Sequence, residues 1–421
     1  MTPIVTSLLD TDFYKFTMQQ IQFFEFSKVR VGFSLNNRTK SVKLVDEIDE
    51  DELRFHLDHA RSLKFQLDEI DYLRSLGMFR EEYLTALVDY QLPPYTIKKV
   101  DGQYVLESED VWWKSSPWEI FFMTIVNELR YQTKLKDLSF EDQSKISIYG
   151  MQRSLKKLDA ISASCPNINL SDLGTRRRFS KKFQGFAIKL AIEVLEGNFS
   201  GTSNVMFAKK YNLTPKGSNA HELPMVLMAL GKENGVLNTY KQYEVLELLQ
   251  KYYGNGIFLP DTFGTTQFLE NAPEWVKTWN GARPDSKDPY IAAEELISWW
   301  KSMGEDVSTK TILFSDGLDV KIDEHSNGDD IISLYNAYND TIKPAFGWGT
   351  NFTNDFTKIG EEIGVDLKPI SIVAKAMSAN GIPTVKLSDN PNKATSTSKE
   401  EIDLYKSTFG VIGLDNKETV V

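Results

Sequence analysis

From residue 168 onward, the chain repeats one local pattern: a short apolar run, a loop of small polar residues and a helix-like stretch. Seven such loops follow in order, at 170–175, 199–203, 217–221, 257–265, 281–286, 312–317 and 345–351. Short apolar runs are typical of buried parallel strands. Because α/β barrels carry their active sites at the carboxyl ends of such strands, the pattern predicts an irregular α/β barrel-like domain with a phosphate-rich ligand at its mouth.

The first 140 residues follow a different pattern. Alternating apolar residues from Val29 to Leu35 predict a strand, residues 46–79 favour helices, and residues 95–113 favour strands. Ser116 and Glu119, on either side of Pro117, match a capping box at the start of a helix. The run that follows is apolar around most of its circumference, which predicts a buried helix.

These patterns divide the chain into three parts. We expect an N-terminal α+β domain at 1–140 and the barrel-like catalytic domain at 141–355. A C-terminal segment at 356–421 is expected to pack back on the N-terminal domain and complete it. Within that segment, 373–377 and 384–387 have the composition of its structural elements.

Composition excludes several classes of protein. The net charge of −11 argues against general affinity for nucleic acid or for an acidic membrane. The single cysteine, Cys165, excludes an intrachain disulfide framework and any multi-cysteine metal site. The sequence carries neither a basic-then-apolar signal segment nor an apolar run long enough to span a bilayer. We therefore expect a cytoplasmic protein with no membrane partner.

The stretch 197–222 concentrates the candidate chemistry. It holds two of the small-residue loops, and the second delivers His221, one of only four histidines, followed at once by Glu222. Small residues let a ligand approach the backbone closely, and a histidine beside a carboxylate can do nucleophilic or acid–base work. The alternative is an ordinary helix start with Ser218 or Asn219 as its N-cap.

Several motifs together resemble one family. They are LLDTDFYKFTM at Leu8–Met18, DLGTRRRFS at Asp172–Ser180, GTSNVMFAKKYNLTPKGSNAHE at Gly201–Glu222, DTFGT at Asp261–Thr265, RPDSKDP at Arg283–Pro289, FSDGLD at Phe314–Asp319 and GWGTNFTND at Gly347–Asp355. Each motif alone is a weak signal, but their order is hard to reach by chance. The chain resembles nicotinate phosphoribosyltransferase over nearly its full length.

The resemblance implies an ATP-coupled reaction that joins nicotinate to 5-phosphoribosyl 1-diphosphate, giving nicotinate mononucleotide and diphosphate for NAD biosynthesis. The residue that ATP phosphorylates in the family matches His221. We add the inference that Glu222 orients or deprotonates its ring. Mg²⁺ is expected with the diphosphate and ATP, with Asp261 as a contact.

The resemblance also implies a set of substrate-binding residues. Tyr14 matches an aromatic residue that stacks on the pyridine ring and comes from the neighbouring subunit, which implies a homodimer with shared active sites. Leu173 stands at the other ring-stacking position, where many relatives have phenylalanine. The remaining matches are Arg176 and Arg283 for the carboxylate and phosphates, Asp285 for ribose hydroxyls, Thr202 and Ser203 as small polar lining groups, and the phosphate loops Ser315, Asp316, Gly317 and Gly349, Thr350, Asn351.

Three adjacent arginines, 176–178, are most often a solvated charge cluster. Successive side chains point in different directions, so at most one or two can face one ligand, and Arg176 is favoured by its place in the loop.

The sequence departs from the family pattern at Lys287, where relatives usually have glycine, and at Leu223, where many have tryptophan. Lysine at position 287 is costly if the backbone needs a positive φ, or else its ammonium adds a phosphate contact. The alternative functions are nicotinamide phosphoribosyltransferase, which would not need a cationic clamp for its neutral amide, and a non-catalytic dimer that binds phosphoribosyl compounds. A purely structural α/β barrel is a further alternative.

Overall fold

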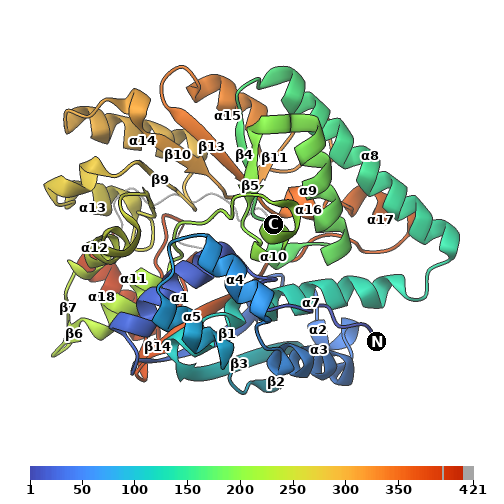
Figure 1. The fold of residues 1–421 in the computed structure, drawn as a ribbon, viewed down its shortest axis with the longest axis horizontal. Helices are drawn as coiled ribbons and strands as arrows, with labels where there is room; N and C mark the ends of the chain where they lie inside the picture. Colours follow the sequence, from blue (N-terminus) through green and yellow to red (C-terminus); the bar gives the residue numbers. More distant parts are fainter. Residues whose placement is uncertain (391–392, 411–421) are drawn as a thin grey trace.

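The structure is a computed structural model that describes residues 1–390 and 393–410. Figure 1 shows an antiparallel sheet in its lower part and a parallel sheet in its upper part, each flanked by helices. The N-terminal helices are α1 Phe13–Glu25, α2 Leu44–Glu47, α3 Glu50–Ser62, α4 Leu67–Ser75, α5 Glu81–Val88, α6 Trp112–Ser115 and α7 Trp118–Leu135.

The antiparallel sheet joins the two ends of the chain. Its strand order is β15-β14-β1-β3-β2, with β1 Arg30–Asn37, β2 Thr96–Val100, β3 Gln103–Val111, β14 Ile372–Ala379 and β15 Ile382–Pro383. Strand β14 pairs with β1 in a register that runs from Val31 opposite Ala379 to Asn37 opposite Ile372. The prediction that the C-terminal segment completes the N-terminal domain is therefore confirmed.

The parallel sheet carries the predicted loops. Its order is β5-β4-β13-β10-β9-β8, with β4 Asn169–Asp172, β5 Phe199–Thr202, β8 Ile257–Phe258, β9 Gly281–Ala282, β10 Thr311–Phe314 and β13 Lys343–Trp348. Six of the seven small-residue loops follow these strands, and since parallel strands end at one edge, the loops meet there. The pairings found among the described residues do not join β5 directly to β8, so closure into a barrel stays a prediction.

The helices of the second half are α8 Phe140–Ser164, α9 Lys181–Leu195, α10 Val205–Tyr211, α11 Glu222–Leu230, α12 Lys241–Tyr253, α13 Thr265–Glu270, α14 Pro289–Ser302, α15 Ile331–Tyr338, α16 Thr350–Thr353, α17 Thr357–Ile363 and α18 Lys399–Phe409. Most of them flank the parallel sheet, whereas α11 and α18 lie beside the antiparallel sheet (Figure 1). Four two-residue strands form two small pairs: β6 Lys232–Glu233 with β7 Val236–Leu237, and β11 Leu318–Asp319 with β12 Asp329–Asp330.

Helix α7 confirms one prediction and corrects another. Every residue from Trp118 to Tyr131 is buried, as its apolar circumference predicted. The capping box is wrong, because no side chain caps this helix. Ser116 and Glu119 instead bind the buried ammonium of Lys15, at 3.2 Å and 2.6 Å.

The stretch 384–387 also differs from expectation. It leaves the antiparallel sheet and lies against a loop of the parallel sheet, where the backbone N–H of Leu387 donates to the carbonyl of Thr262 at 3.0 Å. The last residues of the predicted C-terminal segment, 411–421, lie outside the described residues.

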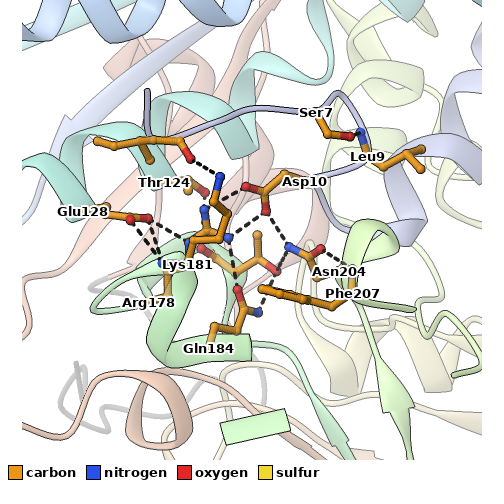
Figure 2. Close-up of polar contacts among 12 residues, drawn as sticks. Ser7, Leu9, Asp10, Thr124, Glu128, Arg178, Lys181, Gln184, Asn204 and Phe207 are labelled. Atoms are coloured by element: carbon orange, nitrogen blue, oxygen red, sulfur yellow. Dashed lines mark hydrogen bonds and ion pairs between the residues drawn. The ribbon is translucent and has the colours of Figure 1, made fainter. Parts of the chain in front are cut away.

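Arg178 has a structural role that the arginine run did not reveal. Figure 2 shows its guanidinium between Asp10 and Glu128, with Gln184 beside it. Both oxygens of Asp10 accept from Arg178, at 2.7 and 2.9 Å, and neither side chain is exposed. Asp10 lies before α1 and Arg178 before α9, so this ion pair joins the N-terminal segment to the parallel-sheet half.

Within residues 1–390 and 393–410, we find no helix with the length and hydrophobicity needed to cross a membrane.

The Asp10–Arg178 pair makes a stability prediction. Asp10→Ala leaves a buried guanidinium with half of its charge partners, and we expect a loss of about 3–5 kcal/mol in the free energy of unfolding, measured by urea denaturation. The matched control is Glu193→Ala, which breaks the exposed Lys189–Glu193 pair and is expected to cost about 1 kcal/mol or less. Equal losses in the two variants would contradict the role assigned to Asp10.

Candidate active site

A cavity of about 200 Å³ lies where the carboxyl edge of the parallel sheet meets strand β14. We call it the His221 cavity. Most of the predicted site residues line it together: Tyr14, Leu173, Arg176, His221, Glu222, Arg283, Asp285, Ser315, Asp316, Gly317, Gly349, Thr350 and Asn351. Residues from α1, α7, the parallel-sheet loops and β14 all contribute, so the site requires both halves of the chain.

His221 is held at both ring nitrogens. It stands at the N-cap position of α11, Nδ1 lies 2.9 Å from Thr262 Oγ1, and Nε2 lies 3.0 Å from Asp285 Oδ2. Lys386 Nζ lies 2.8 Å from the same Nε2. The alternative of an ordinary capped helix start is wrong, since neither Ser218 nor Asn219 caps α11.

The imidazole of His221 is neutral near pH 7. Burial, reinforced by the positive charge of Lys386, lowers the pKa of His221 to about 4. Burial alone would raise the pKa of Asp285, but its hydrogen bond to His221 and the charge of Arg283 hold that pKa well below the usual range. The site therefore pairs a neutral ring with an ionised carboxylate.

Glu222 does not have the role that was predicted for it. Its carboxylate accepts from Lys15 Nζ at 2.5 Å, from Gln22 Nε2 at 2.9 Å and from Trp112 Nε1 at 2.6 Å. Its side chain is thus committed to α1 and α6, while Thr262, Asp285 and Lys386 hold the ring. Consecutive residues at a helix start point in different directions, which explains the error.

The walls of the His221 cavity are strongly cationic. Its basic lining residues are Arg38, Arg176, Arg177, Arg283, Lys375, Lys386 and Lys393, against the acidic Glu119, Glu222, Asp285 and Asp316. Burial, together with the charges of Lys386 and Arg38, holds the pKa of Lys375 well below its usual range. A positive cavity in a chain of net charge −11 is a site for a polyanion.

Sequence analysis missed several of these cations. Arg38 follows β1, whereas Lys375, Lys386 and Lys393 reach the cavity because β14 and the segment after it return to the N-terminal sheet. A signal was available for Lys375, since a lysine within the otherwise apolar run of β14 is unusual for a buried strand. Arg177 also lines the cavity beside Arg176, so two of the three arginines face one site.

The two predicted phosphate loops line the cavity, and the side chain of Ser315 leaves a polar group free there. The hydroxyl of Ser315 is buried and has no hydrogen-bond partner among the described residues. Asp316, an unfavourable neighbour for a phosphate, binds the ammonium of Lys393. Asn351 donates to the carbonyls of Leu318 and Asn327, which fixes its loop against the other one.

Tyr14 and Leu173 line the cavity from the same chain. Helix α1 presents Tyr14, whose hydroxyl lies 3.5 Å from Glu119 Oε1. Tyr14 therefore lies at the site of its own chain, and the expected contribution of a tyrosine from a neighbouring subunit stays a prediction.

Thr202 and Ser203 are not lining groups of the His221 cavity. Thr202 is fully buried and donates to Asp172 Oδ2 at 2.6 Å, so it supports the loop after β4. Ser203 donates to Asp12 Oδ1 at 2.7 Å and lines a second cavity described below.

Asp261 lies close to both His221 and Asp285. Asp261 Oδ1 is buried, has no hydrogen-bond partner in the described parts of the chain, and lies 4.0 Å from His221 Nε2. Ligand atoms of His221, Asp261 and Asp285 all lie within 4.8 Å of one another. Two carboxylates with an orphaned oxygen fit a hard cation such as Mg²⁺.

The structure shows whether Lys287 needs a glycine-like backbone or contacts the His221 cavity. It is absent from the residues with positive φ, so its backbone needs no glycine. Its ammonium donates to Glu295 at 2.6 Å and to Thr266 at 3.2 Å, and it does not line the His221 cavity. Lysine at this position therefore forms an ion pair within the protein and does not contribute to the lining of the His221 cavity.

The environment of His221 predicts a titration. We expect His221 to stay neutral until the pH falls to about 4, measured by NMR of labelled histidine rings and assigned with His221→Gln. Lys386→Met removes the neighbouring charge and should raise this pKa, although burial keeps it below 6.5. Lys393→Met, which removes a lysine paired with Asp316, is the control. An unchanged pKa in Lys386→Met would contradict the assigned contact.

Comparison with known proteins agrees with the geometry. The model of the nicotinate phosphoribosyltransferase (NAPRTase) family matches residues 168–412, and the model of its N-terminal domain matches residues 9–127.

Solved structures agree over nearly the whole chain. A nicotinate phosphoribosyltransferase from Vibrio cholerae is 27% identical with a TM-score of 0.85, over 97% of this chain and 94% of that one. A Saccharomyces cerevisiae structure described by the same activity is 26% identical with a TM-score of 0.84, over 98% and 99%. A nicotinate phosphoribosyltransferase from Porphyromonas gingivalis is 25% identical with a TM-score of 0.83, over 97% and 100%. The chain therefore belongs to the nicotinate phosphoribosyltransferase family.

Proposed function

We propose that this chain transfers the phosphoribosyl group of 5-phosphoribosyl 1-diphosphate to nicotinate, and that ATP drives the reaction through transient phosphorylation of His221. The observation that carries the proposal is a neutral, doubly anchored histidine in a cationic cavity. Membership of the nicotinate phosphoribosyltransferase family supports the identity of the substrates.

In the transfer step, the bond from ribose C1 to the diphosphate oxygen breaks and a bond from C1 to the pyridine nitrogen forms. The reaction needs no protein nucleophile, so the chain must hold both reactants and stabilise the leaving diphosphate. Arg283 suits this task, since its Nε is buried without a partner among the described residues and its fork can bind a phosphate or carboxylate in two places. Asp285, which lines the same cavity, is our candidate for binding the ribose hydroxyls.

The pyridine ring is assigned to the space between Tyr14 and Leu173. Both side chains line the His221 cavity and also the second cavity behind it. Arg176, which lies 3.3 Å from Asp12, borders the same space and is the candidate partner of the nicotinate carboxylate. Because nicotinamide is neutral, the positive charge of Arg176 favours binding of nicotinate over nicotinamide.

In the ATP-dependent step, a ring nitrogen of His221 attacks the γ-phosphorus and ADP leaves. A neutral imidazole is a competent acceptor, and the low pKa keeps it unprotonated at physiological pH. In the tautomer in which Nδ1–H donates a hydrogen bond to Thr262 Oγ1, the lone pair on Nε2 is the nucleophile. Lys386, 2.8 Å from Nε2, is placed to neutralise the incoming phosphoryl group.

Mg²⁺ is the proposed cofactor, with Asp261 and Asp285 as the residues that would hold it. When bound, it neutralises charge on the diphosphate and on ATP. Asp261 keeps one oxygen available for this purpose, because Ser286 occupies the other at 2.5 Å.

His221→Ala tests the proposal. The ratio of transfer rates with and without ATP, followed by diphosphate release, should fall to unity, while slow ATP-independent transfer remains. His59→Ala removes a histidine far from the cavity and should keep the stimulation. ATP stimulation of equal size in His221→Ala would refute the phosphohistidine role. No release with nicotinate from the folded wild-type protein would refute transfer itself, and nicotinamide serves as the parallel substrate.

Lys287→Gly tests whether Lys287 stabilises the fold through its ion pair with Glu295 and does not bind substrate. Removing its ammonium leaves Glu295 without its ion pair, so we expect a loss of about 1–3 kcal/mol in the free energy of unfolding. The KM for 5-phosphoribosyl 1-diphosphate should not change, because Lys287 lies outside the His221 cavity. A raised KM with unchanged stability would instead indicate a phosphate contact.

A further inference from the structure

A second cavity, of about 400 Å³, lies behind the proposed ring site. We call it the rear chamber. It shares Tyr14, Leu173, Arg176 and Arg283 with the His221 cavity. The proposed function leaves the rest of the chamber without a role.

The chamber follows the inner side of the parallel sheet toward the amino ends of the strands. Asn169, Ile257 and Thr311, each the first residue of its strand, line it. Three exposed residues, Asn169, Gly217 and Gly254, also belong to the lining, so the chamber reaches the protein surface. A small molecule can therefore occupy it without passing through the phosphate site.

The middle of the chamber is apolar and aromatic. Its lining there consists of Phe13, Leu249, Tyr253, Ile257, Trp279, Leu313 and Ala345. Such walls suit an aromatic ring, which gains from burial of its faces.

Lys216 gives the chamber a positive charge of its own. The backbone N–H of Lys216 donates to the carbonyl of Thr202 at 2.8 Å. Its stem lies over Gly201, where a Cβ would come within 3.1 Å of Lys216 Cε. No ion pair or hydrogen bond of its ammonium occurs within residues 1–390 and 393–410. Because the side chain of Lys216 is half-buried, an anion beside its ammonium would be stabilising.

Other lining groups in the chamber are also unsatisfied. Ser218 Oγ, Arg283 Nε and the indole N–H of Trp279 are buried and lack a hydrogen-bond partner in the described part of the chain. Trp279 is 2% exposed. The chamber's one carboxylate, Asp12, already binds Ser203 and Arg176. The lining thus offers hydrogen-bond donors and positive charge, and it lacks a free negative group.

From these observations we infer that the rear chamber is a second binding site, which takes an aromatic monocarboxylate with its carboxylate at Lys216 and its ring against the apolar walls. Nicotinate is the member of this class that the proposed function supplies, and the choice of probe rests on that function. The molecule in the chamber is additional to the one that reacts.

The test counts nicotinate molecules per chain by equilibrium dialysis with labelled nicotinate. We expect two in the wild type and one in Lys216→Met, which keeps the length of the side chain but loses its charge. Lys216→Arg should restore the second molecule. Lys209→Met, which removes a lysine paired with Asp68 outside the chamber, should bind two. Labelled nicotinamide, which lacks the carboxylate, should not fill the chamber site.

Several outcomes would overturn the inference: a single nicotinate in the wild type, two in Lys216→Met, or displacement of the second molecule by inorganic phosphate as readily as by benzoate. Unfolding midpoints check that each variant is folded. Trp279→Phe, which keeps an aromatic ring but removes the indole N–H, should weaken the second site only.

The rate of nicotinate mononucleotide formation should be unchanged in Lys216→Met, and this measurement separates the rear-chamber proposal from the proposed function. Absence of product in the wild type refutes the proposed function, whereas product with one bound nicotinate refutes the chamber alone.

Discussion

The buried ammonium of Lys15 is the interaction on which the site depends. It lies between Glu119 Oε2 at 2.6 Å and Glu222 Oε2 at 2.5 Å, and its side chain is 1% exposed. These residues belong to α1, α7 and α11, so one charge ties the N-terminal helices to the helix that begins after His221. Because an uncompensated buried charge costs several kcal/mol, α11 cannot shift away without exposing three ionised groups. The position of His221 is fixed by this cluster, although no member of it touches the ring.

The sequence predicted those parts of the site that local patterns encode. Loops after parallel strands must meet at one edge, so Arg283, Ser315 and Gly349 could be grouped without knowledge of the packing. The cluster around Lys15 was not predictable in this way, since Ser116 and Glu119 fit a capping box as well as an ion network. Lys386 and Lys393 were missed for a related reason. They reach the site through pairing of β14 with β1, which are more than 300 residues apart, and sequence periodicity carries no information on such pairing.

Within the part of the chain that the structure describes, some lysines and arginines of the His221 cavity lack the acidic partners that buried basic side chains usually have. Lys375 has no ion pair among the described residues, and its pKa is held low by burial and by its neighbours. Arg177 has a pKa lowered to about 10 by burial, with Arg176 adding repulsion. Such groups destabilise the empty cavity, so a polyanion that binds there relieves the repulsion as well as adding contacts. Binding of substrate should therefore stabilise the fold.

His221 Nε2 has two hydrogen-bonding neighbours, one of which requires a proton on this nitrogen while the other requires a lone pair. Asp285, at 3.0 Å, bonds to Nε2 only when that nitrogen carries the proton, whereas Lys386, at 2.8 Å, can donate only to its lone pair. Thr262 fits both forms, because a hydroxyl can accept from Nδ1 or donate to it. The ammonium of Lys386 also attracts Asp285, whose carboxylate lies 3.9 Å away. This attraction weakens the hydrogen bond that Asp285 could accept from a protonated Nε2. Lys386 thus favours the tautomer with a nucleophilic Nε2, which is the form that the proposed phosphoryl transfer requires.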